Sequence, residues 1–261
     1  MWDRNFPQIN KLPNSFVLML YLIGLGLELE GISKKGLEVA KRCKRVYLEK
    51  YTVDFPYSLK DLEEIFLKKI IPAERSFVES MEIIDEAKKM DVALLIYGSP
   101  LTATTHITLL QEAKRCRVKI EVIYSASILD AVAQTGLQLY KFGKITSMPK
   151  WDKLKSFTPD SFIKVIQENL SIDAHSLILV DIGMNFSEAM EQLKISAEKN
   201  GLELNKLIVC QSLGTKRKKI IYKNVNELED ENVKKPYCII IPAKLHFVEK
   251  EILEEIYTYE E

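Results

Sequence analysis

The chain has 261 residues, of which 47% are hydrophobic and 28% charged, and its formal net charge is zero. These values are typical of a globular protein that buries a substantial core. The charge balance favours neither a nucleic-acid nor a membrane partner, and no run approaches the roughly 18 apolar residues of a membrane span. The start lacks the basic and then apolar order of a secretory signal. Four widely spaced cysteines without a Cys-x-x-Cys pair predict reduced thiols in a cytosolic protein.

The amino-terminal part combines an irregular stretch with an apolar run. Residues 1–17 contain two prolines and three asparagines without periodicity, which predicts an extension without regular structure. Residues 18–23 are continuously apolar, as expected of a parallel strand buried on both faces. The run leads into Gly24 and Gly26, but Leu29 stands where a dinucleotide-binding loop has its third glycine. We therefore do not favour a dinucleotide site, and a structural tight turn is one alternative.

The first half of the chain alternates between helix and strand patterns. After the first strand we predict a helix over 33–43 capped by Ser33, a strand over 45–52, helices over 58–68 and 76–89, a strand over 92–97, a helix over 102–116 with Ile107, Leu110 and Ala113 on one face, and a strand over 118–124. This order predicts a parallel sheet with helical crossovers.

The second half has a more mixed pattern. We predict a helix starting within 125–128 and running through Gly136, helices over 158–170 and 185–200, strands over 175–182, 207–212, 219–223 and 237–241, and a final helix ending near 257. The fold prediction is therefore two α/β domains, over 18–124 with a mostly parallel sheet and over 125–261 with a mixed sheet. The sequence shows no flexible linker between the two domains. It also shows no internal repeat.

The most informative stretch follows the strand predicted over 92–97. The apolar run ends at Gly98, Pro100 follows, and a row of small hydroxyl and methyl side chains leads to His106. A turn at the carboxyl end of a parallel strand is where open α/β sheets bind ligands. Gly98 lets the backbone approach a ligand closely, and Pro100 stiffens the turn. We therefore predict a ligand site here.

The three histidines of the chain show no metal-ligand spacing, so we predict no metal site. His106, at the predicted helix start, has two interpretations: it orients a substrate, or it is a hydrogen-bonded structural histidine, which we favour. His246 has the same two interpretations. The basic run over 216–219 is either a solvated hairpin or a docking patch for an acidic face of a protein substrate. It lacks the interleaved aromatic residues of a nucleic-acid site.

Three segments of the chain resemble one family. Residues 21–27, 98–106 and 136–144, the last containing Gly-Leu-x-x-Tyr-Lys-Phe-Gly, are similar to segments of diphthine synthases. These belong to the tetrapyrrole-methylase-like group of S-adenosylmethionine-dependent methyltransferases, and the resemblance runs from Leu18 to the end. Ser99 stands where the family has an Asp, and the segment over 211–215 also departs from the family pattern.

The resemblance implies a function. It implies repeated methylation of the amino group on the modified histidine of translation elongation factor 2, in diphthamide biosynthesis. It also implies S-adenosylmethionine as the donor, bound in the cleft between two domains, and a cytoplasmic homodimer of archaeal type. Met19 would then be the ancestral start. Two alternatives stay open: a tetrapyrrole methylase, against which the block over 136–144 argues, and a non-catalytic paralogue that binds the donor or the elongation factor.

The resemblance also implies donor-binding residues, whereas it assigns no catalytic residue. They lie at or near the ends of predicted strands, at separate places along the chain: Leu27, Ser99, Thr102, Ser127, Ile128, Val180, Leu213 and Tyr237. At Ser99 a hydroxyl cannot replace the charge of a carboxylate beside a cationic donor. We therefore expect weaker donor binding or altered catalysis, with activity retained.

Overall fold

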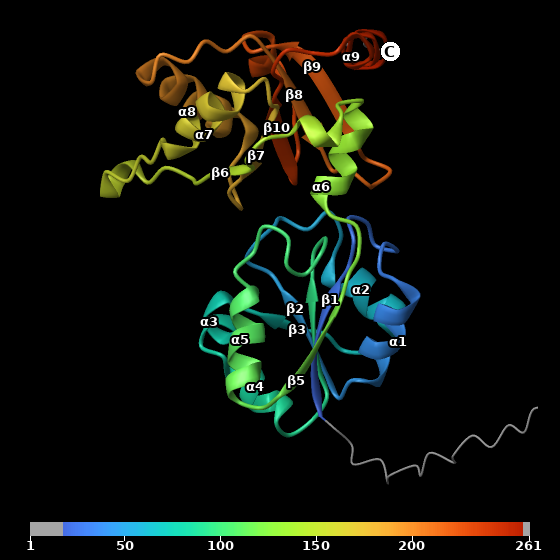
Figure 1. Cartoon of the computed structure of the whole chain (residues 1–261). Helices are drawn as coiled ribbons and strands as arrows, with labels where there is room; N and C mark the ends of the chain where they lie inside the picture. Colours follow the sequence, from blue (N-terminus) through green and yellow to red (C-terminus); the bar gives the residue numbers. More distant parts are fainter. Residues whose placement is uncertain (1–17, 258–261) are drawn as a thin grey trace, which may run out of the picture.

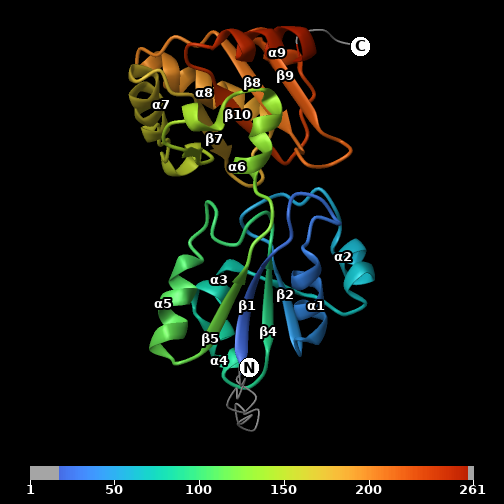
Figure 2. The same cartoon turned by 45° about the vertical axis from the view of Figure 1, so that its right-hand side comes forward.

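A computed structural model describes residues 18–257 of the chain. The extension predicted over residues 1–17 lies outside the described residues. The described part forms two layered α/β units, one above the other in Figure 1, and the view in Figure 2 shows the same arrangement. Within residues 18–257, no helix is long and apolar enough to cross a membrane.

The first unit is built on a five-stranded sheet of order β3-β2-β4-β1-β5, and every strand pair in it is parallel. Its strands are β1 (Met19–Gly24), β2 (Arg45–Glu49), β3 (Ile71–Ala73), β4 (Val92–Ile96) and β5 (Lys119–Ile123). The central strand β4 is fully buried because helices cover both faces of the sheet. The predicted parallel sheet with helical crossovers is confirmed.

Two groups of helices form these covers (Figure 1). On one face lie α1 (Lys34–Arg42) and α2 (Leu59–Phe66), and on the other α3 (Arg75–Glu79), α4 (Glu82–Ala87) and α5 (Ile107–Arg115). Alternate residues of β4 serve the two layers: Leu94 packs against the second group, and Leu95 against the first. The continuous apolar run of this strand follows from that double burial.

The second unit has a mixed sheet of order β6-β7-β10-β8-β9. Only β6 and β7 pair in parallel, and the other pairs are antiparallel. The strands are β6 (Thr146–Met148), β7 (Ser176–Val180), β8 (Lys206–Gln211), β9 (Lys219–Asn224) and β10 (Tyr237–Ile241). The mixed sheet predicted for the second half is therefore confirmed.

Helices cover this sheet on both faces as well. One core contains α7 (Ser161–Ser171) and α8 (Phe186–Lys199), and the other contains α9 (Phe247–Tyr257) and residues next to α6 (Ile128–Ala131). Four short 3-10 helices complete the described secondary structure: η1 (Val132–Thr135), η2 (Leu139–Lys141), η3 (Lys153–Lys155) and η4 (Glu227–Asp230).

The helix starts follow from capping residues in the sequence. The hydroxyl of Ser33 accepts the backbone N–H of Gly36 at 3.1 Å, as predicted for the first helix. Capping boxes open three further helices: Ser58 with Asp61, Ser127 with Asp130, and Asn185 with Glu188. Each box satisfies backbone donors that the first turn of a helix leaves without partners.

Two helix predictions in the first half were wrong in extent. The helix predicted over 76–89 is interrupted because Met81 adopts a left-handed conformation (φ 65°), which separates α3 from α4. The helix predicted from Thr102 begins only at Ile107, since the intervening residues form a bend around Ala103 (φ 54°). Ile107 is consequently exposed rather than part of the helix's buried face, which Leu109 and Ala113 provide.

The helix predicted through Gly136 is also corrected. The chain forms α6 and then η1, and Gly136 ends η1 with φ 85°. A Cβ atom at this position would lie 2.4 Å from Cγ2 of Ile252 in α9. Gly136 therefore permits a left-handed turn and close packing against the last helix. The strands β3 and β6, of three residues each, were not predicted at all.

Candidate functional site

A cavity of about 730 Å³ lies between the two sheets. Its walls in the first unit come from the loops that follow all five strands at their carboxyl ends, and the second unit supplies β6, the end of β7 and the ends of β8 and β10. The volume lies in the range of small-molecule sites. The predicted ligand site after β4 is part of this cavity.

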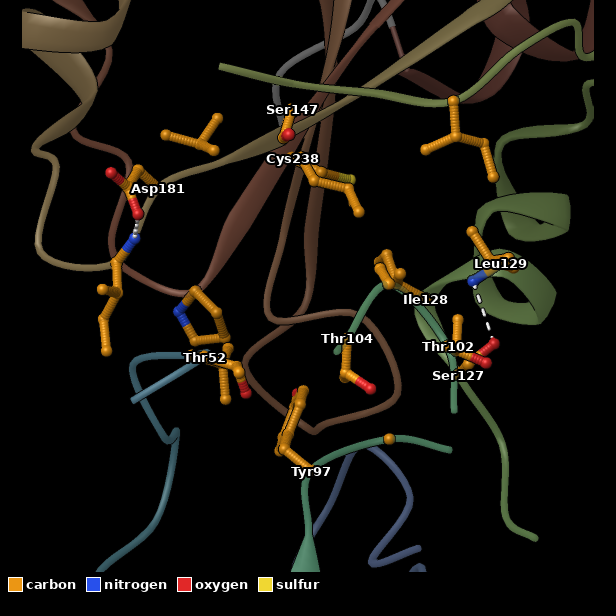
Figure 3. A pocket seen from close by; sticks show the side chains of 18 of the residues that line it. Thr52, Tyr97, Thr102, Thr104, Ser127, Ile128, Leu129, Ser147, Asp181 and Cys238 are labelled. Carbon is orange, nitrogen blue, oxygen red and sulfur yellow. Dashed lines mark hydrogen bonds between the residues drawn. The ribbon is translucent and has the colours of Figure 1, made fainter. Parts of the chain in front are cut away.

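All eight residues implied as donor contacts line this one cavity. They come from separate elements: Leu27 follows β1, Ser99 and Thr102 follow β4, Ser127 and Ile128 follow β5, Val180 ends β7, Leu213 follows β8, and Tyr237 begins β10. Figure 3 shows Thr102, Ser127 and Ile128 together on one side of the cavity. The folded chain thus brings together residues that lie far apart in the sequence.

Two glycines join the loops after β1 and β4. The backbone N–H of Gly98 donates to the carbonyl of Gly26 at 2.9 Å, and Gly26 returns the bond at 3.1 Å. Gly98 has a left-handed conformation (φ 70°) that favours glycine. A Cβ atom on the neighbouring Gly24 would lie 2.6 Å from the Gly98 carbonyl oxygen. Small residues here let backbone form the cavity wall.

The hydroxyl groups on the first-unit side are partly committed to the fold. The Ser127 hydroxyl donates to Asp130 at 2.9 Å. It also accepts the backbone N–H of Leu129 at 3.2 Å, as Figure 3 shows. The backbone N–H of Thr102 donates to the carbonyl of Ser99 at 3.1 Å, which closes the turn after β4. The Ser99 side chain is buried and lines the cavity, and within residues 18–257 its hydroxyl has no hydrogen-bond partner, so it remains available to a ligand.

The second unit contributes an apolar wall. The Tyr237 hydroxyl donates to the carbonyl of Met184 at 3.2 Å, and its ring meets Phe186 edge-on with centroids 5.5 Å apart. Burial raises the pKa of the Tyr237 phenol. Val180 and Leu213 line the cavity with this neutral ring. The wall suits a flat heterocycle better than a charged group.

His106 lies behind the cavity wall rather than on it. Its Nδ1 lies 3.2 Å from the Pro100 carbonyl and must donate to it, so its Nε2 accepts the hydroxyl of Tyr51 at 3.2 Å. Burial lowers the pKa of this imidazole. Both ring nitrogens of this neutral imidazole are therefore hydrogen-bonded within the fold, as expected of a structural histidine. His246 also lies outside the residues that line the cavity.

Sequence reasoning missed several lining residues. Tyr51, Thr52 and Val53 follow β2, Arg75 follows β3, and Cys238 belongs to β10. The position of Tyr51 near the end of the strand predicted over 45–52 was a usable signal, because the carboxyl ends of parallel strands meet at one edge of the sheet. Arg75 carried no such signal, since β3 was not predicted. Among the described lining residues, Arg75 and Asp181 are the two with charged side chains.

The basic run over 216–219 occupies the turn between β8 and β9. The guanidinium of Arg217 donates to the carbonyl of Pro56, and Lys219 pairs with Glu231 at 2.9 Å. Asp54 provides a second bridge between the units, because it accepts the backbone N–H of Gly183 at 2.8 Å. The hydrogen bonds of Arg217 and Asp54 thus join the two units. Neither of these two contacts between the units was predicted from the sequence.

Comparisons with known proteins agree with this architecture. Residues 19–229 match the sequence model of tetrapyrrole (corrin/porphyrin) methylases. The diphthine synthase of Methanocaldococcus jannaschii is 38% identical over 253 residues, spanning 90% of this chain and 98% of that protein. The diphthine methyl ester synthase of Saccharomyces cerevisiae is 35% identical over 268 residues, spanning 91% and 89%.

A solved structure gives the same result in three dimensions. A crystal structure of diphthine synthase superimposes with a TM-score of 0.84 at 33% sequence identity, covering 92% of this chain and 96% of that one. These relatives do not favour a tetrapyrrole substrate, although the fold is shared with tetrapyrrole methylases. The chain belongs to the diphthine synthase family of methyltransferases.

Proposed function

We propose that the protein transfers methyl groups from S-adenosylmethionine to the amino group on the modified histidine of translation elongation factor 2, several times in succession. The observation that carries the proposal is the convergence of all eight implied donor contacts, from Leu27 to Tyr237, on one cavity between the units. The proposal assigns these eight residues to donor binding.

The residues present fit such a donor. The apolar wall around Tyr237 suits an adenine ring, and the backbone of the glycine-bearing loops suits the small sulfonium region. The donor supplies an electrophilic methyl group on a positively charged sulfur. The chain's residues hold the donor and acceptor in line and exclude water, which accounts for catalysis without a covalent intermediate on the protein. Each N-methylation needs the lone pair of the amine, so the attacking nitrogen must first lose its proton.

The names of the relatives indicate a second acceptor atom. The yeast relative is a diphthine methyl ester synthase, and a methyl ester forms on the oxygen of a carboxyl group. We extend this chemistry to the present chain: its acceptor carries both an amine and a carboxylate. Whether the carboxylate is methylated too is decided by counting methyl groups on the product.

We further propose a homodimer in the cytoplasm. Tyr140 in η2 and Phe247 at the start of α9 are largely exposed, and Lys141 and Glu249 tie these two elements together at 2.6 Å. Neighbouring exposed apolar side chains are typical of a protein interface. The four free thiols support a reducing compartment. Sedimentation of the wild type and of a Tyr140→Glu variant tests the dimer, which the variant should weaken.

The experiment that tests the function compares acceptors. The protein is incubated with methyl-labelled S-adenosylmethionine and either unmethylated elongation factor 2 or a porphyrinogen precursor. Label on the elongation factor alone supports the proposal. Label on the porphyrinogen alone would reassign the protein to tetrapyrrole methylation. Donor binding without transfer to either acceptor would make it the non-catalytic paralogue.

A further inference from the structure

The cavity has two ends that the order of the parallel sheet separates. The implied donor contacts of the first unit follow β4, β1 and β5, whereas Tyr51, Thr52, Val53 and Arg75 follow β2 and β3. Neighbouring strands lie about 4.8 Å apart, so β3 is roughly 10 Å from β4 and 19 Å from β5. We name the region lined by these four residues the acceptor end. It lies beside the implied donor site rather than within it.

The two ends also differ in access to solvent. The donor contacts Ser127 and Leu213 are 5% and 3% exposed. The side chain of Arg75 is 61% exposed, although it lines the same cavity. A histidine carried by a large protein can reach the cavity only from an open side. The acceptor end satisfies this requirement, and the buried donor end does not.

The Arg75 side chain is held in place, but N–H groups of its guanidinium remain free to donate hydrogen bonds. Its guanidinium carbon lies 5.2 Å from the centroid of the Tyr51 ring, and the Tyr51 hydroxyl is anchored to His106. The Arg75 guanidinium forms an ion pair with Glu79, one helical turn away, at 3.7 Å. This distance is too long for a hydrogen bond, and the pair is exposed. A planar guanidinium with free N–H groups is suited to bidentate binding of a carboxylate.

We propose that the acceptor end is the subsite for the modified histidine, and that Arg75 binds the carboxylate of its amino-acid-like side chain. This inference rests on the proposed function, which supplies an acceptor with both an amine and a carboxylate. With the carboxylate held over Tyr51, the amine is directed toward the loop after β4, where the donor's methyl group would lie. Arg75 is thus a specificity-determining residue, and it forms no bond with the methyl group.

S-adenosylmethionine is itself an amino acid derivative and carries a carboxylate. The test must therefore distinguish binding of the donor's carboxylate from binding of the acceptor's carboxylate. The variants Arg75→Gln and Arg75→Lys are compared with Arg115→Gln. Arg115 is a matched control because its side chain is also largely exposed, at 75% against 61% for Arg75, pairs with Glu112 at 3.1 Å within α5, and lies outside the cavity. Donor Kd is measured by calorimetry, and kcat and KM for elongation factor 2 by methyl transfer.

For Arg75→Gln we expect kcat/KM for the acceptor to fall about 30-fold, the effect of losing one charge-assisted interaction, with the donor Kd unchanged within about twofold. Arg75→Lys should recover part of the loss, because lysine keeps the positive charge but lacks the planar guanidinium that binds a carboxylate through two N–H groups. Arg115→Gln should behave as wild type, and all three should unfold at the wild-type temperature.

Two results would overturn the assignment while leaving the proposed function intact. A weakened donor Kd with an unchanged acceptor KM would assign the bound carboxylate to the donor. Wild-type kinetics in Arg75→Gln would show that Arg75 binds neither carboxylate. A wild-type protein that transfers no methyl group to elongation factor 2 would instead refute the proposed function, and the acceptor assignment with it.

Discussion

Gly26 and Gly98 exchange two backbone hydrogen bonds, 3.1 Å and 2.9 Å long, and so connect the loops that leave neighbouring strands β1 and β4. The contact places bare backbone at the cavity wall. Gly98 adopts a left-handed conformation, which favours glycine, and the absence of a side chain also lets a ligand approach the backbone. Glycine at this position therefore serves both the turn and the binding of a ligand. Local backbone geometry and ligand binding are therefore coupled at this position.

Replacing Gly98 with Ala separates these two roles. An L-residue at φ 70° costs roughly 1–2 kcal/mol of stability, and the added Cβ would lie 3.7 Å from Cα of Ser127, at the donor end. Gly201→Ala is the control, since Gly201 has φ 63° and open space around its Cβ position. Denaturant unfolding should show similar losses for both variants, whereas donor Kd should rise only for Gly98→Ala. An unchanged Kd would exclude Gly98 from the donor wall.

Ser99→Asp should strengthen binding of the cationic donor. A carboxylate facing the sulfonium contributes roughly 1 kcal/mol, or about fivefold in Kd, in a partly solvated site. The control is S-adenosylhomocysteine, whose sulfur is neutral: its affinity should not rise. Calorimetry with both ligands checks this. Equal effects on both, or no effect on either, would show that Ser99 does not face the sulfur.

Glu249 links α9 to the preceding segments and predicts a pH dependence of stability. Burial acts to raise its pKa, but hydrogen bonds from Lys141 and from the backbone N–H groups of Gln138 and His246, together with His175, outweigh this and hold the pKa at about 2. His175 is neutral here because its Nδ1 accepts the backbone N–H of Ala243, and burial lowers its pKa.

The folded pKa of Glu249 lies below its ordinary value of 4.5, so its contribution is fully present above about pH 4.5 and is lost as the pH falls toward about 2. The contribution at neutral pH is about 3 kcal/mol. Urea unfolding of wild type and Glu249→Gln should therefore give a stability difference that shrinks across this window. A difference that stays constant with pH would contradict the assignment.

Gly136→Ala should destabilise the second unit by about 3 kcal/mol, because it adds strain at φ 85° and a clash with Ile252. The double variant with Ile252→Ala should lose less than the sum of the two single variants, since it removes the closest clashing atom, Cγ2, and leaves Cβ of residue 252 at 2.9 Å. Thermal unfolding measures all three. Strict additivity would show that the two residues do not contact each other.

Much of the fold could be predicted from the sequence, for identifiable reasons. Capping residues such as Ser33 and Asn185 fix helix starts locally, and the apolar run of β4 records burial on both faces. The short strands β3 and β6 offer too few residues for a pattern. The break at Met81 lacks the glycine that usually marks a left-handed residue, so periodicity ran through it.

The site was predicted unevenly for a related reason. Residues within the recognised segments, such as Ser99 and Thr102, proved to line the cavity. Arg75 did not emerge because its place depends on β3 pairing beside β2, a relationship between segments rather than a property of either. Sequence patterns locate strand ends, but the sheet order decides which of them share a cavity.

The most direct test of the account is intact-protein mass spectrometry of elongation factor 2 that carries the unmethylated precursor, after incubation with this protein and S-adenosylmethionine. We predict stepwise additions of methyl groups that map to the modified histidine, and their final number shows whether the carboxylate is methylated as well as the amine. An unchanged mass, under conditions in which calorimetry shows that the donor is bound, would contradict the proposed acceptor.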